Sequence, residues 1–264
     1  MARNVAGRGR ARFGSARHGW ARQGVAGHGD IMATVAMVQA RLNSQRFPRK
    51  ALAEVAPGLP MVRAVCLQVL QTHGLDDTIL VCPPCDLGAF ASALSGLPVR
   101  LAPAQTVPVR WHPDGTVAAW DVLAAFASVA SDLPDDALVA RITADCPALD
   151  PEAVTLTLAA ARVTGFAVSE HTASGWPDGS ACEVVTVGLL REAARAATWP
   201  RDREHPTRWL YRHHPAIVVE NPHGDVGHLK LSVDCEADLT RVREYLQART
   251  RVRQHVGTLT PKDS

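Results

Sequence analysis

A polar loop with several cations follows the first apolar run of the chain. Residues 33–37 have the composition of a buried strand, and the ten residues 41–50 after it contain four basic side chains and no acidic one. These cations are Arg41, Arg46, Arg49 and Lys50. Guanidinium and ammonium groups bind phosphate oxygens, and α/β proteins bind nucleotides where core strands end. The loop therefore predicts a site for a polyanion such as a nucleoside triphosphate, with a solvated basic loop as the alternative.

Two aspartates come directly after apolar runs elsewhere in the chain. Asp145 follows the run 137–142, and Asp234 follows the run 229–233. A carboxylate at the exit of a core strand can hold Mg²⁺ that also binds phosphate oxygens. The alternatives are a turn aspartate ahead of Pro147 and an acidic start to the helix that follows Asp234. The repeated pattern of strand and then aspartate favours the metal site.

Two further polar segments could line the same cleft. Asp178 lies in an Asp-Gly turn, and Glu183 enters the next strand-like run. A hairpin-like turn explains the first but not the second, because an acid that leads into Val184 can face a cleft. Residues 201–207 combine Arg, Asp, Glu, His and Thr, and local ion pairs at a helix start are the alternative there.

The elements that must position these residues alternate along the chain. Apolar, β-branched runs predict strands at 33–38, 78–82, 98–101, 137–142, 166–169, 183–187, 216–220 and 229–233. Helical spacing of apolar residues predicts helices at 62–70, 119–130 and 239–246, and Asp150-Pro151-Glu152 predicts the start of another that continues to Ala161. This alternation predicts a three-layer α/β/α sandwich with a mostly parallel sheet, whose ligands bind at the carboxyl ends of the strands.

Composition separates a tail from the body of the protein. Residues 1–31 hold six Arg and one Asp, which leaves 22 basic and 25 acidic side chains in the other 233 residues. We expect 1–31 to be a disordered basic tail, read either as a segment outside the native protein or as a transit peptide, and 32–264 to be a single domain. The net negative body gives no reason to expect nucleic-acid binding, and the absence of a long apolar run predicts no membrane span.

Six cysteines accompany a chain without a secretory signal, which predicts a reduced, cytoplasmic protein. Cys82-Pro83-Pro84-Cys85 is a CxxC segment after a strand-like run. It is interpreted as structural thiols in a turn, because no second CxxC or His pair accompanies it; a redox pair or half of a zinc site are the alternatives.

Taken in order, these segments resemble the cytidylyltransferase family of the spore-coat polysaccharide type, related to CMP-ketodeoxyoctonate and CMP-sialate synthetases. The resemblance runs from about residue 33 to residue 246. The matching residues are Gln39, Ala40, Arg41, Ser44, Arg46, Pro48 and Lys50 in the loop, then Arg141 to Pro147, Pro177 to Gly179 with Glu183, Asp202 to His205 with Thr207, and Val233, Asp234, Asp238 and Leu239.

The resemblance implies a nucleotide-diphospho-sugar transferase fold of the GT-A-like, Rossmann-like type, Mg²⁺ as cofactor and a homodimer. It implies transfer of CMP from CTP to an acidic sugar with release of pyrophosphate, in surface polysaccharide biosynthesis. The expected nucleotide-binding residues are Gln39, Ala40, Arg41, Asn43, Ser44, Arg46, Lys50, Arg141 and Thr143, with Arg41, Lys50 and Asp145 catalytic. The expected metal ligands are Asp145 and Asp234, and the expected acceptor-binding residues are Asp178, Glu183, Arg203 and His205.

The chain departs from the family pattern at four positions. Asn43 and Arg49 stand where Gly is usual, Ala181 where an acid is usual, and Leu231 where Trp is usual. The alternatives are therefore a nucleotidyltransferase that uses GTP or UTP with a sugar phosphate, and a weakened nucleotide-binding or scaffold homologue.

Overall fold

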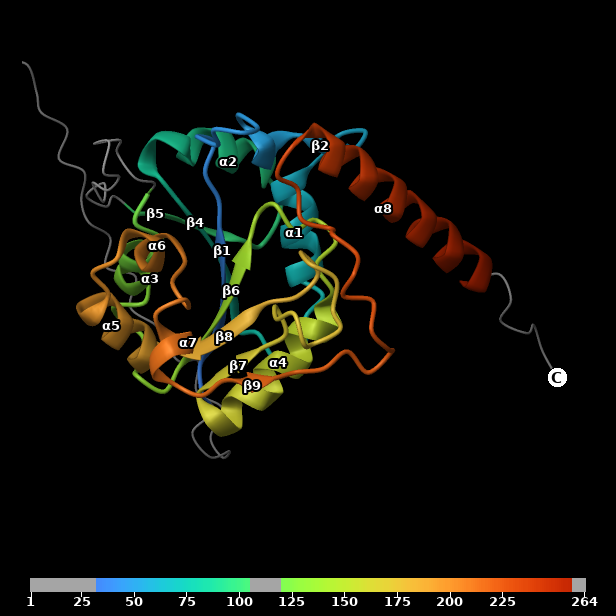
Figure 1. Ribbon diagram of the computed structural model, residues 1–264. Coiled ribbons are helices and arrows are strands. Elements are labelled where there is room, and N and C mark those ends of the chain that lie inside the picture. Colours follow the sequence, from blue (N-terminus) through green and yellow to red (C-terminus); the bar gives the residue numbers. More distant parts are fainter. Residues whose placement is uncertain (1–31, 105–119, 258–264) are drawn as a thin grey trace, which may run out of the picture. The chain divides into compact units, whose positions relative to one another are not determined.

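A seven-stranded sheet forms the centre of the computed structural model, which describes residues 32–104 and 120–257 (Figure 1). The strand order is β5-β4-β1-β6-β8-β7-β9. The strands are β1 (Thr34–Gln39), β4 (Asp77–Cys82), β5 (Arg100–Pro103), β6 (Leu138–Thr143), β7 (Phe166–Val168), β8 (Glu183–Thr186) and β9 (Ile217–Val218). The predicted tail 1–31, and residue 119 where a helix was predicted to begin, lie outside the described residues.

The sheet is mostly parallel. β1 pairs in parallel with β4 and β6, β4 with β5, and β7 with β9. β8 pairs antiparallel with both of its neighbours, β6 and β7. Because β8 runs in the opposite direction, its first residue, Glu183, lies beside Arg141 near the carboxyl end of β6. A residue that begins a strand therefore reaches the same edge as residues that end the others.

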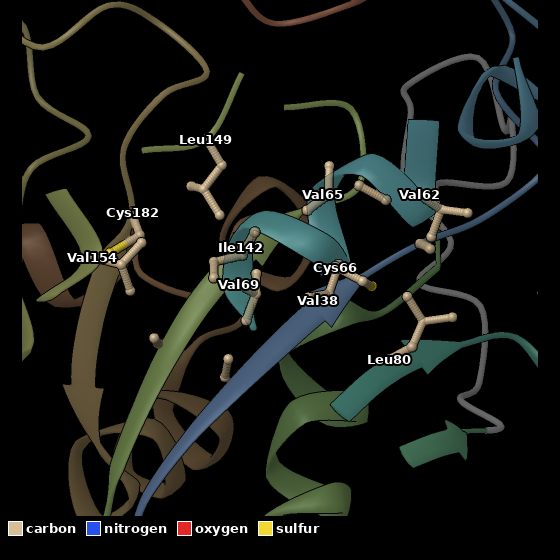
Figure 2. Packing of buried hydrophobic residues seen from close by; sticks show 14 of the residues in the cluster. Val38, Val62, Val65, Cys66, Val69, Leu80, Ile142, Leu149, Val154 and Cys182 are labelled. Carbon is tan, nitrogen blue, oxygen red and sulfur yellow. The ribbon is translucent and has the colours of Figure 1, made fainter. Parts of the chain in front are cut away.

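Helices cover both faces of the sheet. α1 (Met61–Val69), α2 (Leu87–Ala93) and α4 (Pro151–Thr164) pack on one face, and α3 (Val122–Val129) and α5 (Val187–Ala196) on the other. The side-chain alternation of each strand divides the core in this way, since Ala36 and Val38 face the first group and Val35 and Met37 the second. Figure 2 shows the first face, where Val62, Val65, Cys66 and Val69 of α1 meet Val38, Leu80 and Ile142. The predicted three-layer α/β/α sandwich is confirmed.

Local signals explain where several helices begin and end. Asp150 caps α4 by accepting a hydrogen bond from the Glu152 N–H at 3.0 Å, and Pro151 occupies the first helical position. Gly165 ends the helix in the left-handed conformation, with φ of 78°. Asp121 caps α3 in the same manner. The predicted start of the helix after Asp150 is confirmed.

Several short elements were not predicted. They are the hairpin β2 (Glu54–Ala56) and β3 (Leu59–Pro60), the 3₁₀ turns η1 (Lys50–Leu52) and η2 (Pro84–Asp86), and the helices α2, α5, α6 (Pro200–Glu204) and α7 (Leu210–His213). Most span fewer residues than the window over which helical or strand periodicity can be recognised, so their formation depends on tertiary contacts.

The strand predicted at 229–233 is wrong. This segment makes an isolated bridge, between Lys230 and Asp178, and its backbone bonds instead to loops. The Leu231 N–H donates to Asp178 O at 2.7 Å, and the Val233 N–H donates to Asp145 O at 2.9 Å. These partners satisfy the backbone of an apolar segment without a neighbouring strand.

A separate apolar cluster holds the same segment in place. Leu231 and Val233 are buried against Val55 of β2 and Val242 of α8 (Glu236–Gly257). The chain just before Asp234 is therefore fixed on two sides, by backbone hydrogen bonds to the loops and by apolar packing against α8.

Gly179 permits the close approach between the 176–180 loop and the 230–234 segment. Its φ is +84°, and a Cβ there would lie 2.4 Å from Ser232 N and 2.7 Å from Ser232 Cα. We expect Gly179→Ala to destabilise the fold by about 3 kcal/mol or more, because left-handed strain of about 1–2 kcal/mol adds to a backbone clash. Urea unfolding measures this loss.

Gly58→Ala is the matched control for Gly179→Ala. Gly58 has φ of +71°, but a Cβ added there would meet nothing within 4 Å, so only the strain remains. Equal losses for the two variants would show that backbone contact at Gly179 contributes nothing.

Candidate functional site

A cleft of about 1470 Å³ opens at the carboxyl ends of β1 and β6. The position is the one expected for ligands of a mostly parallel sheet. The cleft brings together most residues that the sequence singled out. They are Gln39, Ala40, Arg41, Asn43, Ser44, Arg46, Lys50, Arg141, Thr143, Asp145, Asp178, Glu183, His205 and Asp234.

Lys50 lies between the two aspartates at the centre of the cleft. Its Nζ is 2.6 Å from Asp145 Oδ2 and 3.5 Å from Asp234 Oδ1, and it also donates to Val233 O at 2.9 Å. Burial of Asp145 favours its neutral form, but the Lys50 ammonium and the hydrogen bonds to the carboxylate together hold the pKa of Asp145 below its usual value. Both carboxylates thus lie beside the same ammonium group, and Asp234 also pairs with Lys230 at 3.2 Å.

The residue before Lys50, Arg49, adopts the left-handed conformation, and Lys50 after this turn contacts both carboxylates. Arg49 has φ of 58°, and its N–H donates to Leu42 O at 2.9 Å, which closes the loop after β1. Glycine adopts this conformation without strain, whereas a side chain there costs about 1–2 kcal/mol. Position 49, where the family pattern has Gly, therefore has a backbone conformation that places a non-glycine residue such as Arg49 under strain.

The other loop cations are also paired with carboxylates. Arg46 Nη2 lies 2.9 Å from Asp234 Oδ1. Arg41 Nη2 lies 2.9 Å from Glu204 Oε1 of α6, and both side chains are 34% exposed. Each of Arg41, Arg46 and Lys50 must therefore exchange a carboxylate for a phosphate oxygen when a polyanion binds. Glu204 was not among the residues we predicted for the site.

The donor set of the two aspartates suits a hard divalent cation. Mg²⁺ takes oxygen ligands, commonly one or two carboxylates together with water and substrate phosphates. Among the described residues, no three His, Cys, Asp or Glu side chains gather as a metal site. An ion bound here would therefore have a protein shell of two carboxylates, Asp145 and Asp234, which fits Mg²⁺ that is shared with a phosphate ligand.

Glu183 anchors the opposite wall of the cleft. Its carboxylate accepts hydrogen bonds from Arg141 Nη1 at 2.7 Å, Thr207 Oγ1 at 2.6 Å and Tyr211 OH at 2.9 Å, and the residue is 5% exposed. Arg141 Nε in turn donates to Gln39 Oε1 at 3.3 Å. Burial and Glu183 together raise the pKa of Tyr211, so its hydroxyl stays protonated. The network joins β1, β6, β8 and α7.

Two residues predicted to bind the acceptor differ in placement. His205 lines the cleft, and burial together with nearby Arg141 lowers the pKa of its imidazole. Arg203 does not line it. Its Nε donates to Asp121 Oδ2 at 2.6 Å and its Nη1 donates to Ala197 O at 3.0 Å. Arg203 therefore connects α6 to α3 and α5, and its guanidinium faces the protein rather than a ligand.

Glu170 lines the cleft and was missed by the sequence analysis. Burial, followed by the carboxylates of Glu183 and Asp178, raises the pKa of Glu170 to about 8, and Arg141 offsets part of this effect. Glu170 is therefore mostly protonated at neutral pH. It directly follows the predicted strand 166–169, so the rule that located Asp145, which looks for acids just after strands, would also have found Glu170.

Comparison with known proteins identifies the family to which these features correspond. A family model described as cytidylyltransferase matches residues 35–247. The 3-deoxy-manno-octulosonate cytidylyltransferase of Herminiimonas arsenicoxydans is 31% identical over 172 residues, 64% of this chain and 62% of that protein. The enzyme of the same name from Nitratidesulfovibrio vulgaris is 32% identical over 115 residues, 44% and 40% of the two chains. The matches thus span about two fifths to three fifths of these relatives.

Solved structures share the fold. A cytidylyltransferase from Leptospira borgpetersenii superimposes with a TM-score of 0.68 at 15% identity, over 88% of this chain and 99% of its own. A CMP:2-keto-3-deoxy-manno-octonic acid synthetase solved with CTP gives 0.59 at 14% identity, over 82% and 99%. Within the described ranges, none of the helices has the length and apolar character needed to cross a bilayer.

Glu170→Gln tests the buried acid of the cleft. The folded pKa of Glu170 lies near 8 and its unfolded value near 4.5, so the native state binds the extra proton between these values. Wild-type stability should fall as pH rises through this window, relative to the variant, by up to about 2–4 kcal/mol. Urea unfolding of both proteins from pH 5 to pH 9 measures the difference, with Glu244→Gln at an exposed position of α8 as the control. A constant difference across this range would contradict the assignment.

Proposed function

The chain belongs to the cytidylyltransferase family, and on that premise we propose that it transfers CMP from CTP to an oxygen atom of a sugar acid, with release of pyrophosphate. The observation that carries the proposal is the Lys50 ammonium placed between Asp145 and Asp234, with Arg41 and Arg46 on the same loop. This arrangement offers cations to three phosphates and carboxylates to one metal ion in a single cleft.

Cationic side chains of the protein would bind the triphosphate and stabilise the charge that develops during transfer. The acceptor oxygen forms a bond to the α-phosphorus, and the bond from that phosphorus to the oxygen it shares with the β-phosphate breaks, so that this oxygen leaves with pyrophosphate. The acceptor hydroxyl loses its proton to solvent water. Negative charge grows on the departing pyrophosphate. Arg41, Arg46 and Lys50 would exchange their carboxylate partners for phosphate oxygens and offset this charge, so that catalysis is mainly positioning and electrostatics.

Asp145 and Asp234 would hold Mg²⁺. The chemistry that a metal ion supplies when bound is to offset part of the negative charge on the phosphates. Lys50 would then turn from the two carboxylates toward the phosphates. The lowered pKa of Asp145 supports this role, because a metal ligand must be ionised when the ion arrives.

The base would lie near Gln39 and Ala40, at the end of β1. The Ala40 N–H donates to Val81 O at 3.0 Å, which leaves the Ala40 carbonyl as the group to contact the base. A carbonyl accepts from the exocyclic amine of cytosine, and the corresponding group of uracil is itself an acceptor. Such a contact would favour CTP over UTP. Asn43, Ser44 and Thr143 would complete the nucleotide side.

The acceptor proposal rests on the relatives whose printed name specifies 3-deoxy-manno-octulosonate. Asp178, Glu183 and His205 line the end of the cleft that remains for an acceptor beyond the triphosphate cations. A sugar acid is the corresponding acceptor class here. We extend the proposal to a role in surface polysaccharide biosynthesis of the spore-coat or CMP-sialate type, to a homodimer and to a cytoplasmic location.

A panel of the four nucleoside triphosphates tests the donor. Isothermal titration should give Mg²⁺-dependent binding of CTP at least about tenfold tighter than that of UTP, GTP or ATP, since one lost hydrogen bond to a buried partner is worth this much. Removal of Mg²⁺ with EDTA should weaken CTP binding. Preference for GTP or UTP would favour a sugar-phosphate nucleotidyltransferase, and binding without metal dependence would favour a scaffold.

Asp145→Asn tests the metal ligand. We expect turnover to fall by about 10²–10³, the usual cost of losing one well-placed charge stabiliser, while the fold survives. Pyrophosphate release measures turnover and urea unfolding checks the fold. Asp136→Asn, at an exposed turn, should leave turnover unchanged. Near-normal CMP transfer by Asp145→Asn would remove Asp145 from the mechanism.

A further inference from the structure

A second hollow adjoins the cleft. It has a volume of about 510 Å³ and lies among the end of α5, α6 and α7. Trp199, Arg201 and Arg208 line both this hollow and the cleft, so the two share a wall. A molecule bound in the acceptor end of the cleft can therefore extend across this wall. The volume suits a group the size of a sugar ring.

The acceptor end of the cleft itself is unfavourable for an anion. Its wall carries the carboxyl groups of Glu170, Asp178 and Glu183. Two cations of the cleft are already committed to partners, since Arg141 pairs with Glu183 and Arg41 pairs with Glu204. A carboxylate placed against this wall would face Asp178 and Glu183 without either arginine free to pair with it, while the protonated Glu170 adds no charge. The acidic group of an acceptor must therefore bind elsewhere.

The shared wall supplies positive charge in excess. Asp202 is buried and accepts from Arg212, and it also pairs with Arg208 at 3.4 Å. One carboxylate thus faces two guanidinium groups. Arg201 adds a third cation, and its exposed side chain forms no ion pair with any of the described residues. This wall differs in sign from the acidic wall of the adjoining cleft.

Aromatic rings accompany these cations. Trp199 is 68% exposed although it is large and apolar. Trp209 stacks on His213, with ring centroids 4.0 Å apart, and lines the same hollow. An indole that is largely exposed, such as that of Trp199, beside guanidinium groups is suited to the apolar face of a sugar ring that carries an anionic substituent.

We propose that Arg201 and Arg208 bind the carboxylate of the acceptor, that Trp199 packs against its ring, and that these three residues set the preference for acidic acceptors. This inference rests on the proposed function and deepens it, because it assigns the acceptor's anionic group to α6 and the chain after it rather than to the acidic wall of the cleft.

Charge removal at the shared wall is the test. The probes are 3-deoxy-manno-octulosonate, N-acetylneuraminate and glucuronate, each with CTP and Mg²⁺, and the probe that gives the fastest pyrophosphate release is used with the variants. Arg201→Gln and Arg208→Gln should each raise the KM for that sugar acid about tenfold or more, as for a lost charge-assisted hydrogen bond. The KM for CTP and kcat should stay within about twofold. Trp199→Ala should also raise the acceptor KM selectively.

Arg195→Gln is the matched control. Arg195 is exposed on α5, and its Nε donates to a carbonyl of its own helix. All its kinetic constants should match wild type. The proposal is overturned if the Arg201→Gln and Arg208→Gln double variant keeps the acceptor KM within twofold, or if the KM for CTP rises by the same factor as that for the acceptor.

The failure of this inference is distinguishable from failure of the proposed function. Wild-type protein that transfers CMP to one of the three sugar acids, together with a double variant that keeps the acceptor KM within twofold, would overturn the inference and leave the proposed function intact. Wild-type protein without Mg²⁺-dependent CTP binding would overturn the proposed function itself.

Discussion

The ion pair between Lys50 and Asp145 is the contact around which the site is built. It joins the loop after β1 to the exit of β6, and the same ammonium reaches Asp234 and Val233 O. Three segments that are distant in sequence thus meet at one positive charge. In a cleft of this polarity, a carboxylate without a counter-charge would be protonated or displaced. The two carboxylates are therefore already paired with cations of the protein, and a metal–nucleotide complex would exchange these partners rather than add to unpaired groups.

The main features of the fold follow from the sequence because long periodic segments dominate it. The strands near 34–39, 77–82 and 138–143 and the helix that Asp150 caps have patterns that only one kind of element satisfies. The error at 229–233 has a physical origin. This apolar run has the composition of a strand, but its backbone N–H groups donate to two loops and its side chains pack against α8. These are tertiary contacts, which cannot be inferred from local composition.

The site was predictable where the topology is regular and unpredictable where it depends on side-chain contacts. Asp145 lies where a strand exits, so its position follows from the sheet alone. Asp234 reaches the cleft although the strand assigned to it does not exist, because backbone pairing with the Asp145 loop brings it there. Arg203 shares a dense polar segment with Glu204, yet one faces the helices and the other faces Arg41. A segment this short gives no periodicity from which the direction of each side chain could be inferred.

The segment before Asp234 is attached through main-chain atoms, since Leu231 and Val233 each donate an N–H to a carbonyl of a neighbouring loop. Such bonds do not depend on side-chain identity, provided that Gly179 leaves room for the approach, and the side chains add only the requirement that residues 231 and 233 stay apolar against α8. Exchange of one apolar residue for another at position 231 would therefore leave Asp234 in the cleft. The location of this carboxylate is thus tolerant of sequence change in the residues that precede it, as long as they remain apolar.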